Sequence, residues 1–432
     1  MEIAVVALGK IGLPLAVQFA ESGHNVHGAD ISQRTVDLIN SAQVPFPGEA
    51  DLDTKLAEQV AAGRLDASTD VTTQVARSEV VVVVVPLIVD DQARPDFTAM
   101  DAATDAIGKG LTAGTLVSYE TTLPVGTTRD RFAPRLAELS GLTLGEDLFV
   151  CFSPERVYSG RIFADLRKYP KVVGGLDAAS TKRAIDFYEA VLQFNERDDL
   201  ARPNGVWDVG TAEAAELVKL AETTYRDVNI GLANEFAVFA RSRGIDIFSV
   251  IDAANSQPFS HIHQPGISVG GHCIPVYPRL YLSNDPSAVV PAASREANEK
   301  MPAYFAGLLT GALDKPISQS RVLVLGLAYR GAVKEWAFSG TFPLVEELRR
   351  LGATVFVNDP LYDADELRAF DFEPSDTSGQ FDAVVLHTDH PEYLELVPAS
   401  FEGLQVMVDG RGVLDPSVWT DAGVRYLSLL PE

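Results

Sequence analysis

Short runs of apolar, mostly β-branched residues alternate with segments of helical periodicity along the first half of the chain. This alternation is typical of a parallel sheet that is covered by helices on both faces, the doubly wound α/β class. It predicts a helix at Gly12–Ser22. The expected strands are Ile3–Ala7, Asn25–Asp30, Val80–Val85, Thr115–Tyr119, Leu148–Cys151 and Lys171–Gly174.

The middle of the chain has a different pattern. From Val206 to Arg243, apolar residues recur at spacings of three and four with no internal proline, which predicts one long helix or two abutting helices. After Pro316 the strand–helix alternation returns. The elements expected there are strands Arg321–Gly326, Thr354–Asn358, Ala383–His387 and Val406–Asp409 and a helix at Phe342–Leu351. We therefore predict two Rossmann-like doubly wound domains joined by a long-helix middle domain, with boundaries at 1–200, 201–315 and 316–432.

Composition narrows the class of protein. The chain has 432 residues, 46% of them hydrophobic, which is enough for two or three separate cores. Its formal net charge of −25 argues against nucleic-acid binding, because a phosphate backbone is bound by patches of Lys and Arg. The longest apolar run, Val80–Val89, is too short to cross a bilayer, and no secretory signal is visible. We expect a soluble cytoplasmic protein with no membrane partner.

Cysteine and histidine usage gives no sign of a metal site. The two cysteines, Cys151 and Cys273, supply neither a disulfide framework nor a four-cysteine site, and a reducing compartment suits them. The seven histidines are scattered, and His261 and His263 have no matching second pair. No metal is predicted.

The turn after the first predicted strand has the context of a dinucleotide site. Gly9 and Gly12 lie between a strand and a helix, where glycines let a pyrophosphate approach backbone N–H groups. Asp30 ends the second strand, and its carboxylate can accept hydrogen bonds from ribose hydroxyls and repel a 2′-phosphate, which favours NAD over NADP. Ala7 stands where the fingerprint has its first glycine, so a plain strand–turn–helix is the alternative. Arg34 is placed to stack on an adenine or is a solvated helix charge.

A second chemical signal is the thiol of Cys273. Gly270 and Gly271 remove side chains directly before it, and Pro275 and Pro278 fix the chain after it, so the backbone is shaped to admit a ligand. Together with a dinucleotide site, a thiol suggests covalent oxidation chemistry. The thiol adds to an aldehyde, the adduct loses hydride, and the resulting thioester is hydrolysed. A buried and inert structural cysteine is the alternative.

The segment from Gly270 to Val276 resembles the active-site motif of the UDP-glucose/GDP-mannose dehydrogenase family. It is most similar to the branch that oxidises UDP-N-acetylhexosamines such as UDP-N-acetylmannosamine. The resemblance extends over nearly the full chain, and the order and spacing of its segments make it specific. The further matching segments are Gly12–Pro14, Glu120–Thr128, Ser153–Val157, Tyr225–Ile230, Arg295–Pro302, Leu325–Tyr329 and Thr388–His390.

The resemblance implies a reaction and four catalytic residues. The primary alcohol at carbon 6 of a nucleotide sugar is oxidised to a carboxylate in two NAD-dependent hydride transfers, without release of the aldehyde. Cys273 is the implied nucleophile, and Lys219 stabilises the developing oxyanion. Glu155 activates water for thioester hydrolysis, and Thr122 positions a water or a substrate hydroxyl. A solvated helix lysine and a helix-start carboxylate are the alternatives for Lys219 and Glu155. His272 is a weak candidate for the base that activates Cys273, because adjacent side chains usually point in different directions.

The resemblance also implies binding contacts. In the family, the C-terminal domain holds the uridine diphosphate and the middle helices form a homodimer. The implied cofactor contacts are Gly9, Lys10, Ile11, Gly12, Asp30, Arg34, Pro86 and Thr122. The implied substrate contacts are Glu155, Arg156, Val157, Lys219, Arg226, Asn229, Gly270, Gly271 and Arg330. Surface charges are the alternative for Arg226 and Arg330.

Five positions depart from the family pattern, and they leave several functions open. Ala7 replaces a glycine and Thr223 an asparagine. Phe259 replaces a basic residue, Tyr277 an aspartate and Ala337 an arginine. Thr223 can still donate a hydrogen bond, whereas Tyr277 cannot supply a carboxylate near neutral pH. The alternatives are a UDP-glucose 6-dehydrogenase, a single oxidation, an epimerisation, or a nucleotide-sugar sensor. Retention of the four catalytic residues argues against the sensor.

Overall fold

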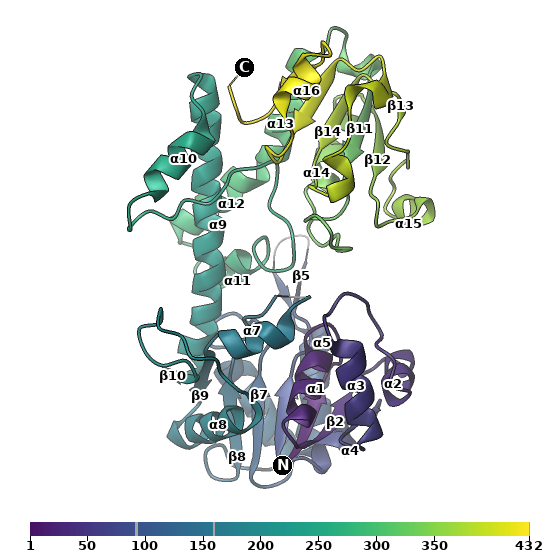
Figure 1. The fold of residues 1–432 in the computed structure, drawn as a ribbon. Coiled ribbons are helices and arrows are strands. Elements are labelled where there is room, and N and C mark those ends of the chain that lie inside the picture. Colours follow the sequence, from purple (N-terminus) through teal and green to yellow (C-terminus); the bar gives the residue numbers. More distant parts are fainter. Residues whose placement is uncertain (91–93, 159, 432) are drawn as a thin grey trace. The chain divides into compact units, whose positions relative to one another are not determined.

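The computed structural model describes residues 1–90, 94–158 and 160–431. The chain divides into two compact units, Met1–Glu222 and Thr223–Glu432 (Figure 1). The boundary falls inside one helix, α9 (Ala212–Ser242), which begins in the first unit and ends in the second. Across the described ranges, no helix combines the length and the apolar character that a membrane crossing requires.

The first unit is built on an eight-stranded sheet with the order β10-β9-β8-β7-β4-β1-β2-β3. Neighbouring strands run parallel apart from β8 and β9, which pair antiparallel. The strands are β1 (Glu2–Val6), β2 (Asn25–Ala29), β3 (Leu65–Ser68), β4 (Val80–Val83), β7 (Thr115–Tyr119), β8 (Leu148–Phe152), β9 (Lys171–Gly175) and β10 (Val206–Thr211). A short antiparallel pair, β5 (Ile88–Val89) and β6 (Pro95–Asp96), lies outside this sheet.

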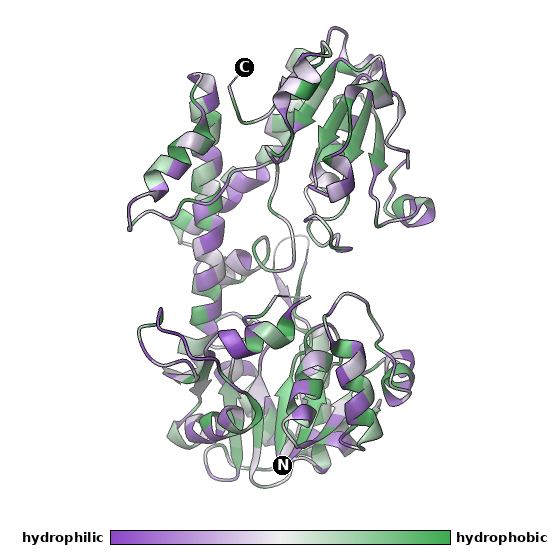
Figure 2. Cartoon of the chain, viewed as in Figure 1, coloured by the Kyte–Doolittle hydropathy of each residue, from purple (hydrophilic) through white to green (hydrophobic). Residues whose placement is uncertain are grey.

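Both faces of this sheet are buried. Ile3 and Val5 of β1 join one apolar cluster, and Ala4 and Val6 join another, so successive side chains point into two different cores. This arrangement explains why the strands are continuous apolar runs rather than alternating ones (Figure 2). The helices that accompany these strands are α1 (Gly12–Glu21), α2 (Gln33–Asn40), α3 (Leu52–Ala61), α4 (Val71–Ala76), α5 (Thr98–Gly110), η1 (Thr128–Phe132), α6 (Ala133–Ser140), α7 (Ile162–Lys168) and α8 (Ala178–Val191).

The second unit begins with the larger part of α9 and ends in a parallel sheet with the order β12-β11-β14-β16-β17. Its strands are β11 (Arg321–Leu325), β12 (Thr354–Asn358), β14 (Ala383–Leu386), β16 (Val406–Asp409) and β17 (Arg425–Leu427), with the two-residue strands β13 (Gly379–Gln380) and β15 (Phe401–Glu402) paired separately. Its helices are α10 (Ile247–Asn255), α11 (Tyr277–Asn284), α12 (Val289–Glu299), α13 (Met301–Ala312), α14 (Thr341–Arg350), α15 (Ala364–Ala369) and α16 (Pro416–Thr420), with 3-10 turns η2 (Ile317–Gln319), η3 (Pro391–Tyr393) and η4 (Pro398–Ser400).

The predicted strands and helices are present, with ends that differ by one or two residues. One expectation was wrong, because Val206–Thr211 forms strand β10 instead of the start of the long helix. These residues pair with β9 at the edge of the sheet, and the helix begins where the Thr211 hydroxyl accepts a hydrogen bond from the Ala214 N–H, 3.2 Å away. The boundaries of the three predicted domains stay a prediction.

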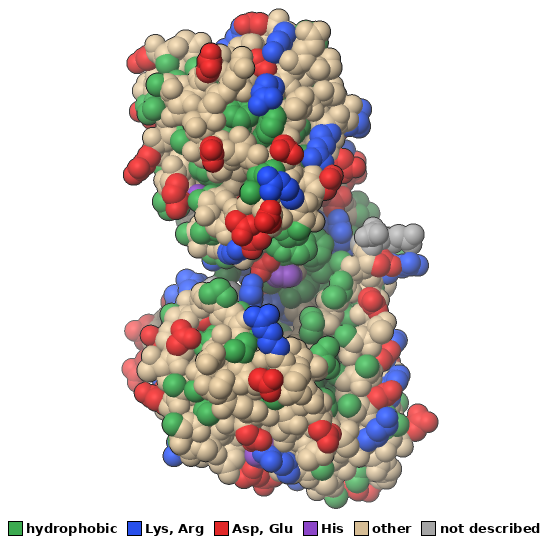
Figure 3. Space-filling view, turned by 90° about the vertical axis from the view of Figure 1, so that its right-hand side faces the viewer, with side chains coloured by type: hydrophobic (Ala, Val, Ile, Leu, Met, Phe, Trp, Pro, Cys, Tyr) green, Lys and Arg blue, Asp and Glu red, His purple; other side chains and the backbone are tan. Residues whose placement is uncertain are grey.

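Charged side chains are spread over both units. On the face drawn in Figure 3, acidic and basic side chains are interspersed on each unit.

Candidate active site

The turn between β1 and α1 requires glycine at one position and strains another. A Cβ on Gly12 would lie 1.9 Å from the Ala7 carbonyl oxygen, so a side chain cannot be accommodated there. A Cβ on Gly9 would meet nothing within 4 Å, so this part of the turn is open. Ala7 has φ 75°, in the left-handed region that favours glycine. The turn therefore keeps the backbone of the glycine fingerprint although its first glycine is missing.

Asp30 fixes this turn from the end of the neighbouring strand. Its Oδ2 accepts a hydrogen bond from the Leu8 N–H at 2.8 Å, and its Oδ1 accepts one from the Ser32 N–H at 2.9 Å. In the sheet order, β1 lies between β4 and β2, so the chain turns in opposite directions on the two sides of β1. Ligands of doubly wound sheets bind at the carboxyl ends of the strands at such a switch point.

The other predicted cofactor residues surround the same strand ends. Lys10 and Ile11 belong to the turn itself, and Ile11 is the N-cap residue of α1. Pro86 follows β4 and is exposed, and Arg34 is exposed on α2. A glycine turn at a helix N-terminus with a carboxylate at the end of the next strand is the arrangement that fits a dinucleotide such as NAD.

The loops after β7 and β8 carry a buried ionic network. Lys171, the first residue of β9, lies between two carboxylates: its Nζ is 2.7 Å from Glu120 Oε2 and 3.0 Å from Glu155 Oε2. The second oxygen of Glu120 accepts a hydrogen bond from the Tyr188 hydroxyl at 2.6 Å, and the Tyr188 hydroxyl is 2.7 Å from Ser118 Oγ. The side chains of Glu120 and Lys171 are 0% and 4% exposed. Glu155, predicted to be catalytic, is therefore held by a group that the sequence analysis did not single out.

Burial and ion pairing act in opposite directions on these groups. Burial raises the pKa of Glu120 to about 7, although Lys171 opposes the rise. For Glu155, burial also opposes ionisation, but the attraction of Lys171 and hydrogen bonds from Lys171 and the Arg156 N–H outweigh it and hold the pKa below its ordinary value. Burial likewise opposes the charge of Lys171, and the two carboxylates outweigh it and raise the pKa of the ammonium.

The first three turns of α9 connect to both loops. Glu216 accepts hydrogen bonds from the Gly126 N–H at 2.6 Å and the Thr128 N–H at 2.9 Å. Lys219, one turn later, donates from Nζ to the Glu155 carbonyl oxygen at 2.6 Å. Glu222 pairs with Arg156. Because these residues are spaced by three, they lie on neighbouring positions of one helix surface. The structure thus brings Lys219 and Glu155 together, and Thr122 lies buried on the loop that Glu216 holds.

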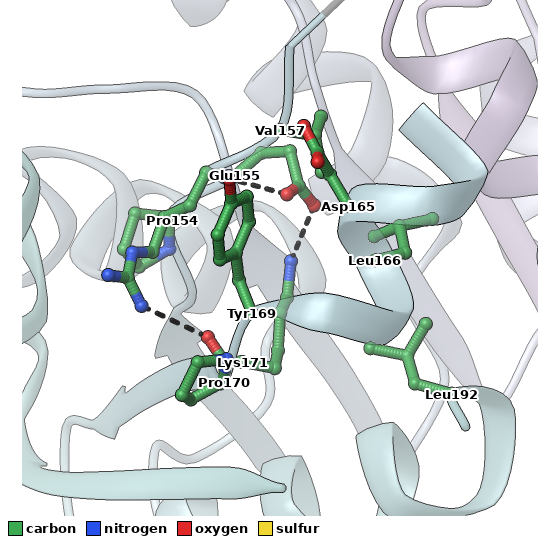
Figure 4. Close-up of a pocket in the computed structure, with 10 residues that line it drawn as sticks. Pro154, Glu155, Val157, Asp165, Leu166, Tyr169, Pro170, Lys171 and Leu192 are labelled. Carbon is green, nitrogen blue, oxygen red and sulfur yellow. Dashed lines mark hydrogen bonds and ion pairs between the residues drawn. The ribbon is translucent and has the colours of Figure 1, made fainter. Parts of the chain in front are cut away.

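A small cavity adjoins this network. It has about 10 Å³ of room for the centre of a water molecule, close to what a single water needs. Its lining includes Glu155, Val157, Asp165 and Lys171, and Figure 4 shows the Lys171 ammonium reaching toward the Glu155 carboxylate. The Nε of Arg156 is buried and has no hydrogen-bond partner among the described residues. Polar groups therefore line a space of about one water beside the predicted base.

In the second unit, Cys273 lies in a loop that packs tightly on the β11–α14 connection. A Cβ on Gly270 would lie 2.5 Å from Tyr329 Cβ, and Gly271 has φ 89°, so both positions require glycine. The Gly271 N–H donates to the Ala337 carbonyl oxygen at 2.8 Å. The thiol itself is partly buried. By contrast, Cys151 is fully buried in β8, where burial raises its pKa to about 12, so it is an inert structural thiol.

A buried ion pair supports the chain that follows the thiol. Arg295 of α12 binds the Asp227 carboxylate at 2.7 Å and donates to the Pro275 carbonyl oxygen at 3.4 Å. Asn298 adds a hydrogen bond to Asp227 at 2.8 Å. Burial raises the pKa of Asp227, although Arg295 and Asn298 oppose the rise. The cysteine loop is thereby tied to two helices.

The positions that depart from the family pattern have definite places. The Tyr277 N–H donates to the Cys273 carbonyl oxygen at 2.9 Å, and Tyr277 begins α11. Thr223 is buried on α9, and Ala337 is buried in the segment that contacts Gly271. The Phe259 side chain is 92% exposed. At the position where the family has an aspartate near the thiol, this chain thus has Tyr277, the first residue of α11.

The predicted substrate residues of the second unit differ in their surroundings. The side-chain amide of Asn229 binds a neighbouring loop. It donates to the His261 carbonyl oxygen at 2.6 Å and accepts from the His263 N–H at 2.8 Å. Arg226 is partly buried on α9, and Arg330 is exposed in the loop after β11. Within the described residues, no group of three or more His, Cys, Asp and Glu is arranged to hold a metal ion.

The loop after β11 is held by side chains that follow the neighbouring strands β12 and β14, as Asp30 after β2 holds the loop after β1. Asp359 Oδ2 accepts hydrogen bonds from the Leu327 and Ala328 N–H groups at 2.7 and 2.8 Å. Asp389 Oδ1 accepts one from the Gly331 N–H, and His390 Nδ1 accepts one from the Ala332 N–H, both at 3.2 Å. Several backbone donors of this loop are therefore satisfied by the protein's own side chains.

Three family models match in order: the NAD binding domain of the UDP-glucose/GDP-mannose dehydrogenase family at residues 1–192, its central domain at 213–301, and its UDP binding domain at 323–416. A UDP-N-acetyl-D-mannosamine dehydrogenase of Pyrococcus horikoshii is 36% identical over 96% of each chain. The enzyme of the same name from Escherichia coli K12 is 31% identical over 95% of this chain and 98% of its own.

The structural comparison agrees. A solved UDP-D-ManNAc dehydrogenase of Pyrococcus horikoshii superimposes with a TM-score of 0.87 at 33% identity, over 99% of both chains. These matches confirm the predicted fold class, NAD as the cofactor and the class of oxidoreductase. The chain belongs to the UDP-glucose/GDP-mannose dehydrogenase family.

Proposed function

We propose that the protein oxidises carbon 6 of a UDP-N-acetylhexosamine, such as UDP-N-acetylmannosamine or UDP-N-acetylglucosamine, to the uronic acid. The observation that carries the proposal is the hydrogen bond from the Lys219 ammonium to the Glu155 carbonyl oxygen, at 2.6 Å. The chain also keeps Cys273 shortly after two positions that require glycine. The names of the two relatives that match nearly the whole chain support the choice of sugar.

The β1–α1 turn is the proposed site of NAD. Gly9, Lys10, Ile11 and Gly12 would lie along the pyrophosphate and Asp30 would bind a ribose, with Arg34, Pro86 and Thr122 as further contacts. When bound there, NAD accepts hydride from the substrate. The residues of the chain bind and orient the two reactants and handle the protons.

The catalytic roles follow from the groups present. Lys219 is a cation that can stabilise negative charge on the sugar oxygen as it loses its proton. The Cys273 thiolate adds to the aldehyde carbon to give a thiohemiacetal, and after the second oxidation it holds the acid as a thioester. Glu155, which is kept ionised by Lys171, takes a proton from the water that cleaves the thioester. Thr122 supplies a hydroxyl that positions this water or a substrate hydroxyl.

The sugar nucleotide needs further contacts. We assign these to Glu155, Arg156, Val157 and Lys219 in the first unit and to Arg226, Asn229, Gly270, Gly271 and Arg330 in the second. Arg330 is exposed and can bind a phosphate with two parallel hydrogen bonds. A cytoplasmic location is part of the proposal, because a reducing compartment keeps Cys273 as a thiol.

A homodimer is proposed on the basis of an apolar surface on α9. Tyr225, Leu232, Phe236 and Phe239 are each more than two-fifths exposed. At 3.6 residues per turn they fall on one side of the helix. Light scattering should give the mass of two chains for the wild type and of one for Phe236→Glu. A wild-type monomer would contradict the proposal.

The test of the reaction is a panel of sugar nucleotides incubated with the purified protein and NAD, with NADH and product mass measured together. Two NADH per UDP-N-acetylhexosamine, with formation of the uronic acid, is the expected result. Preference for UDP-glucose would make the protein a UDP-glucose 6-dehydrogenase. One NADH would indicate a single oxidation, a new epimer without net NADH an epimerase, and binding without turnover a sensor.

The covalent mechanism has its own test. Cys273→Ser should abolish acid formation, because an alcohol is a far weaker nucleophile than a thiolate. In the slow Glu155→Gln variant, mass spectrometry should detect the substrate linked to Cys273. Full turnover by Cys273→Ser would rule out the thioester.

A further inference from the structure

One buried ammonium serves two carboxylates in the first unit. Lys171 contacts Oε2 of both Glu120 and Glu155, at 2.7 and 3.0 Å. The remaining oxygens are also occupied, because Tyr188 donates to Glu120 Oε1 and the Arg156 N–H donates to Glu155 Oε1, each at 2.6 Å. The two carboxylates are thus linked to each other through a single nitrogen that carries exchangeable protons.

Lys171 alone does not balance both carboxylates when both are ionised, and Lys219 adds a positive charge that favours ionisation of Glu155. Burial where water is excluded disfavours the charged form, so a carboxylate in this cluster tends to take a proton. The two are not equivalent: the Glu120 side chain is fully buried, whereas that of Glu155 is 10% exposed. The pKa of Glu120, raised by burial to about 7, and the lowered pKa of Glu155 agree with this order: a proton taken up by the pair resides on Glu120, and above about pH 7 Glu120 is ionised and can accept one.

The surroundings contain other charges, which bear on this balance. Lys219 of α9 donates to the Glu155 carbonyl oxygen, and its positive charge also favours ionisation of the Glu155 carboxylate. The other ionisable groups that face the cluster are Arg156 and its partner Glu222, Asp165 of α7 in the lining of the adjoining cavity, and Cys151 of β8. Arg156 pairs with Glu222, so the positive charges that remain beside the two carboxylates are the ammonium groups of Lys171 and Lys219.

From this geometry we propose that Lys171 is a positioning residue that keeps Glu155 ionised, and that Glu120 stores the proton that Glu155 removes from the hydrolytic water. The inference rests on the proposed function, since it concerns the hydrolysis of the thioester. It assigns a purpose to a cluster of three ionisable groups of which only Glu155 contacts the reacting atoms.

The proton transfer is balanced. As the water oxygen forms its bond to the thioester carbon, its O–H bond breaks and the proton goes to Glu155. Lys171 then donates one of its protons to the Glu120 carboxylate and receives the proton of Glu155. At the end Lys171 is again an ammonium, Glu155 is again a carboxylate, and Glu120 is a carboxylic acid.

The proposal predicts a pH dependence that a purely structural role does not. Glu120 can accept the proton only when it is ionised, so the rate of thioester hydrolysis in the wild type should rise with pH around pH 7. Glu120→Gln, which keeps the shape and offers hydrogen bonds, should lose this rise and slow hydrolysis by about 10-fold or more, as removal of a general base does. The KM for the sugar nucleotide should stay unchanged, because Glu120 is fully buried and in this proposal does not contact the substrate.

Lys171 variants test the other half. In Lys171→Met the two carboxylates lose the cation that they share, and only Lys219 still acts on Glu155. Glu155 should therefore bind a proton more readily, and the rising limb should move by at least about one unit to higher pH. Lys171→Arg should restore the wild-type position, because a guanidinium can also bridge two carboxylates. The matched control is Lys182→Met, which removes an exposed lysine paired with Asp186 and should leave the profile unchanged.

The experiment is a single-turnover reaction with NAD and the preferred sugar nucleotide across the pH range, with the first NADH and the released acid followed separately. The proposal fails if Glu120→Gln or Lys171→Met lowers hydrolysis without any change in its pH profile. If the wild type makes no NADH at all, the proposed function fails. Infrared spectroscopy then still tests the cluster, because below about pH 7 Glu120→Gln should show one protonated carboxyl fewer than the wild type, in which Glu216 also holds a proton.

Discussion

Glu216 offers a sharp test of how burial acts on this fold. Its side chain is fully buried at the start of α9, and it accepts hydrogen bonds from the Gly126 and Thr128 N–H groups and from the Thr128 hydroxyl. Burial raises its pKa from 4.5 to about 7 despite these hydrogen bonds. The folded protein therefore holds a proton on Glu216 over a range in which the unfolded chain has lost it.

The sign and size of the effect follow from this shift. Because the pKa is higher in the folded state, the contribution to stability is complete below pH 4.5 and is lost as the pH rises through about 7. A shift of about 2.5 units corresponds to about 3.4 kcal/mol, at 1.36 kcal/mol per unit. Glu216→Gln cannot titrate, so relative to this variant the wild type should lose about 3 kcal/mol between acid and alkaline pH.

The assay is urea unfolding of both proteins at a series of pH values, followed by circular dichroism. The difference between the two free energies of unfolding cancels the titration of every group that they share. A constant difference across the range would refute the reasoning, because it would mean that Glu216 has the same pKa in the folded and unfolded chains. Glu58→Gln, which replaces an exposed glutamate on α3, another helix of the first unit, is the matched control.

Three further predictions concern other parts of the chain. Ala7→Gly should stabilise the first unit by about 0.5 kcal/mol, because relief of left-handed strain of about 1–2 kcal/mol exceeds the added entropy of the unfolded glycine; a lower melting temperature would contradict this. Arg295→Met should destabilise the second unit by about 3 kcal/mol in urea, since it leaves Asp227 buried without its cation; an unchanged midpoint would mean that Asn298 suffices. Asp30→Ser should raise KM for NAD more than KM for NADP, and equal changes would exclude Asp30 from ribose recognition.

The sequence predicted those parts of the candidate site that local chemistry encodes. Gly12 and Asp30 could be found because a turn and the end of the next strand lie at a characteristic spacing. Cys273 could be found because glycines and prolines flank it. In both cases a few neighbouring residues carry the signal, so the fold need not be known in advance.

The ionic cluster could not be predicted in this way. Lys171 meets Glu120 and Glu155 from positions 51 and 16 residues distant in the chain, and Glu216 reaches Thr128 across 88. In the sequence, Lys171 is merely the polar start of an apolar strand. Only the pairing of β8 with β9 makes it a neighbour of the loops that follow β7 and β8. The same is true of Val206–Thr211, where pairing with β9 as the edge strand of the sheet overrides a helical pattern.

The filled backbone donors of the loop after β11 bear on how a phosphate can bind there. Asp359, Asp389 and His390 already accept hydrogen bonds from the N–H groups of Leu327, Ala328, Gly331 and Ala332. A phosphate of the sugar nucleotide would therefore depend on a side-chain cation such as Arg330. Salt screens such a contact, so the affinity for the sugar nucleotide should fall as the ionic strength rises.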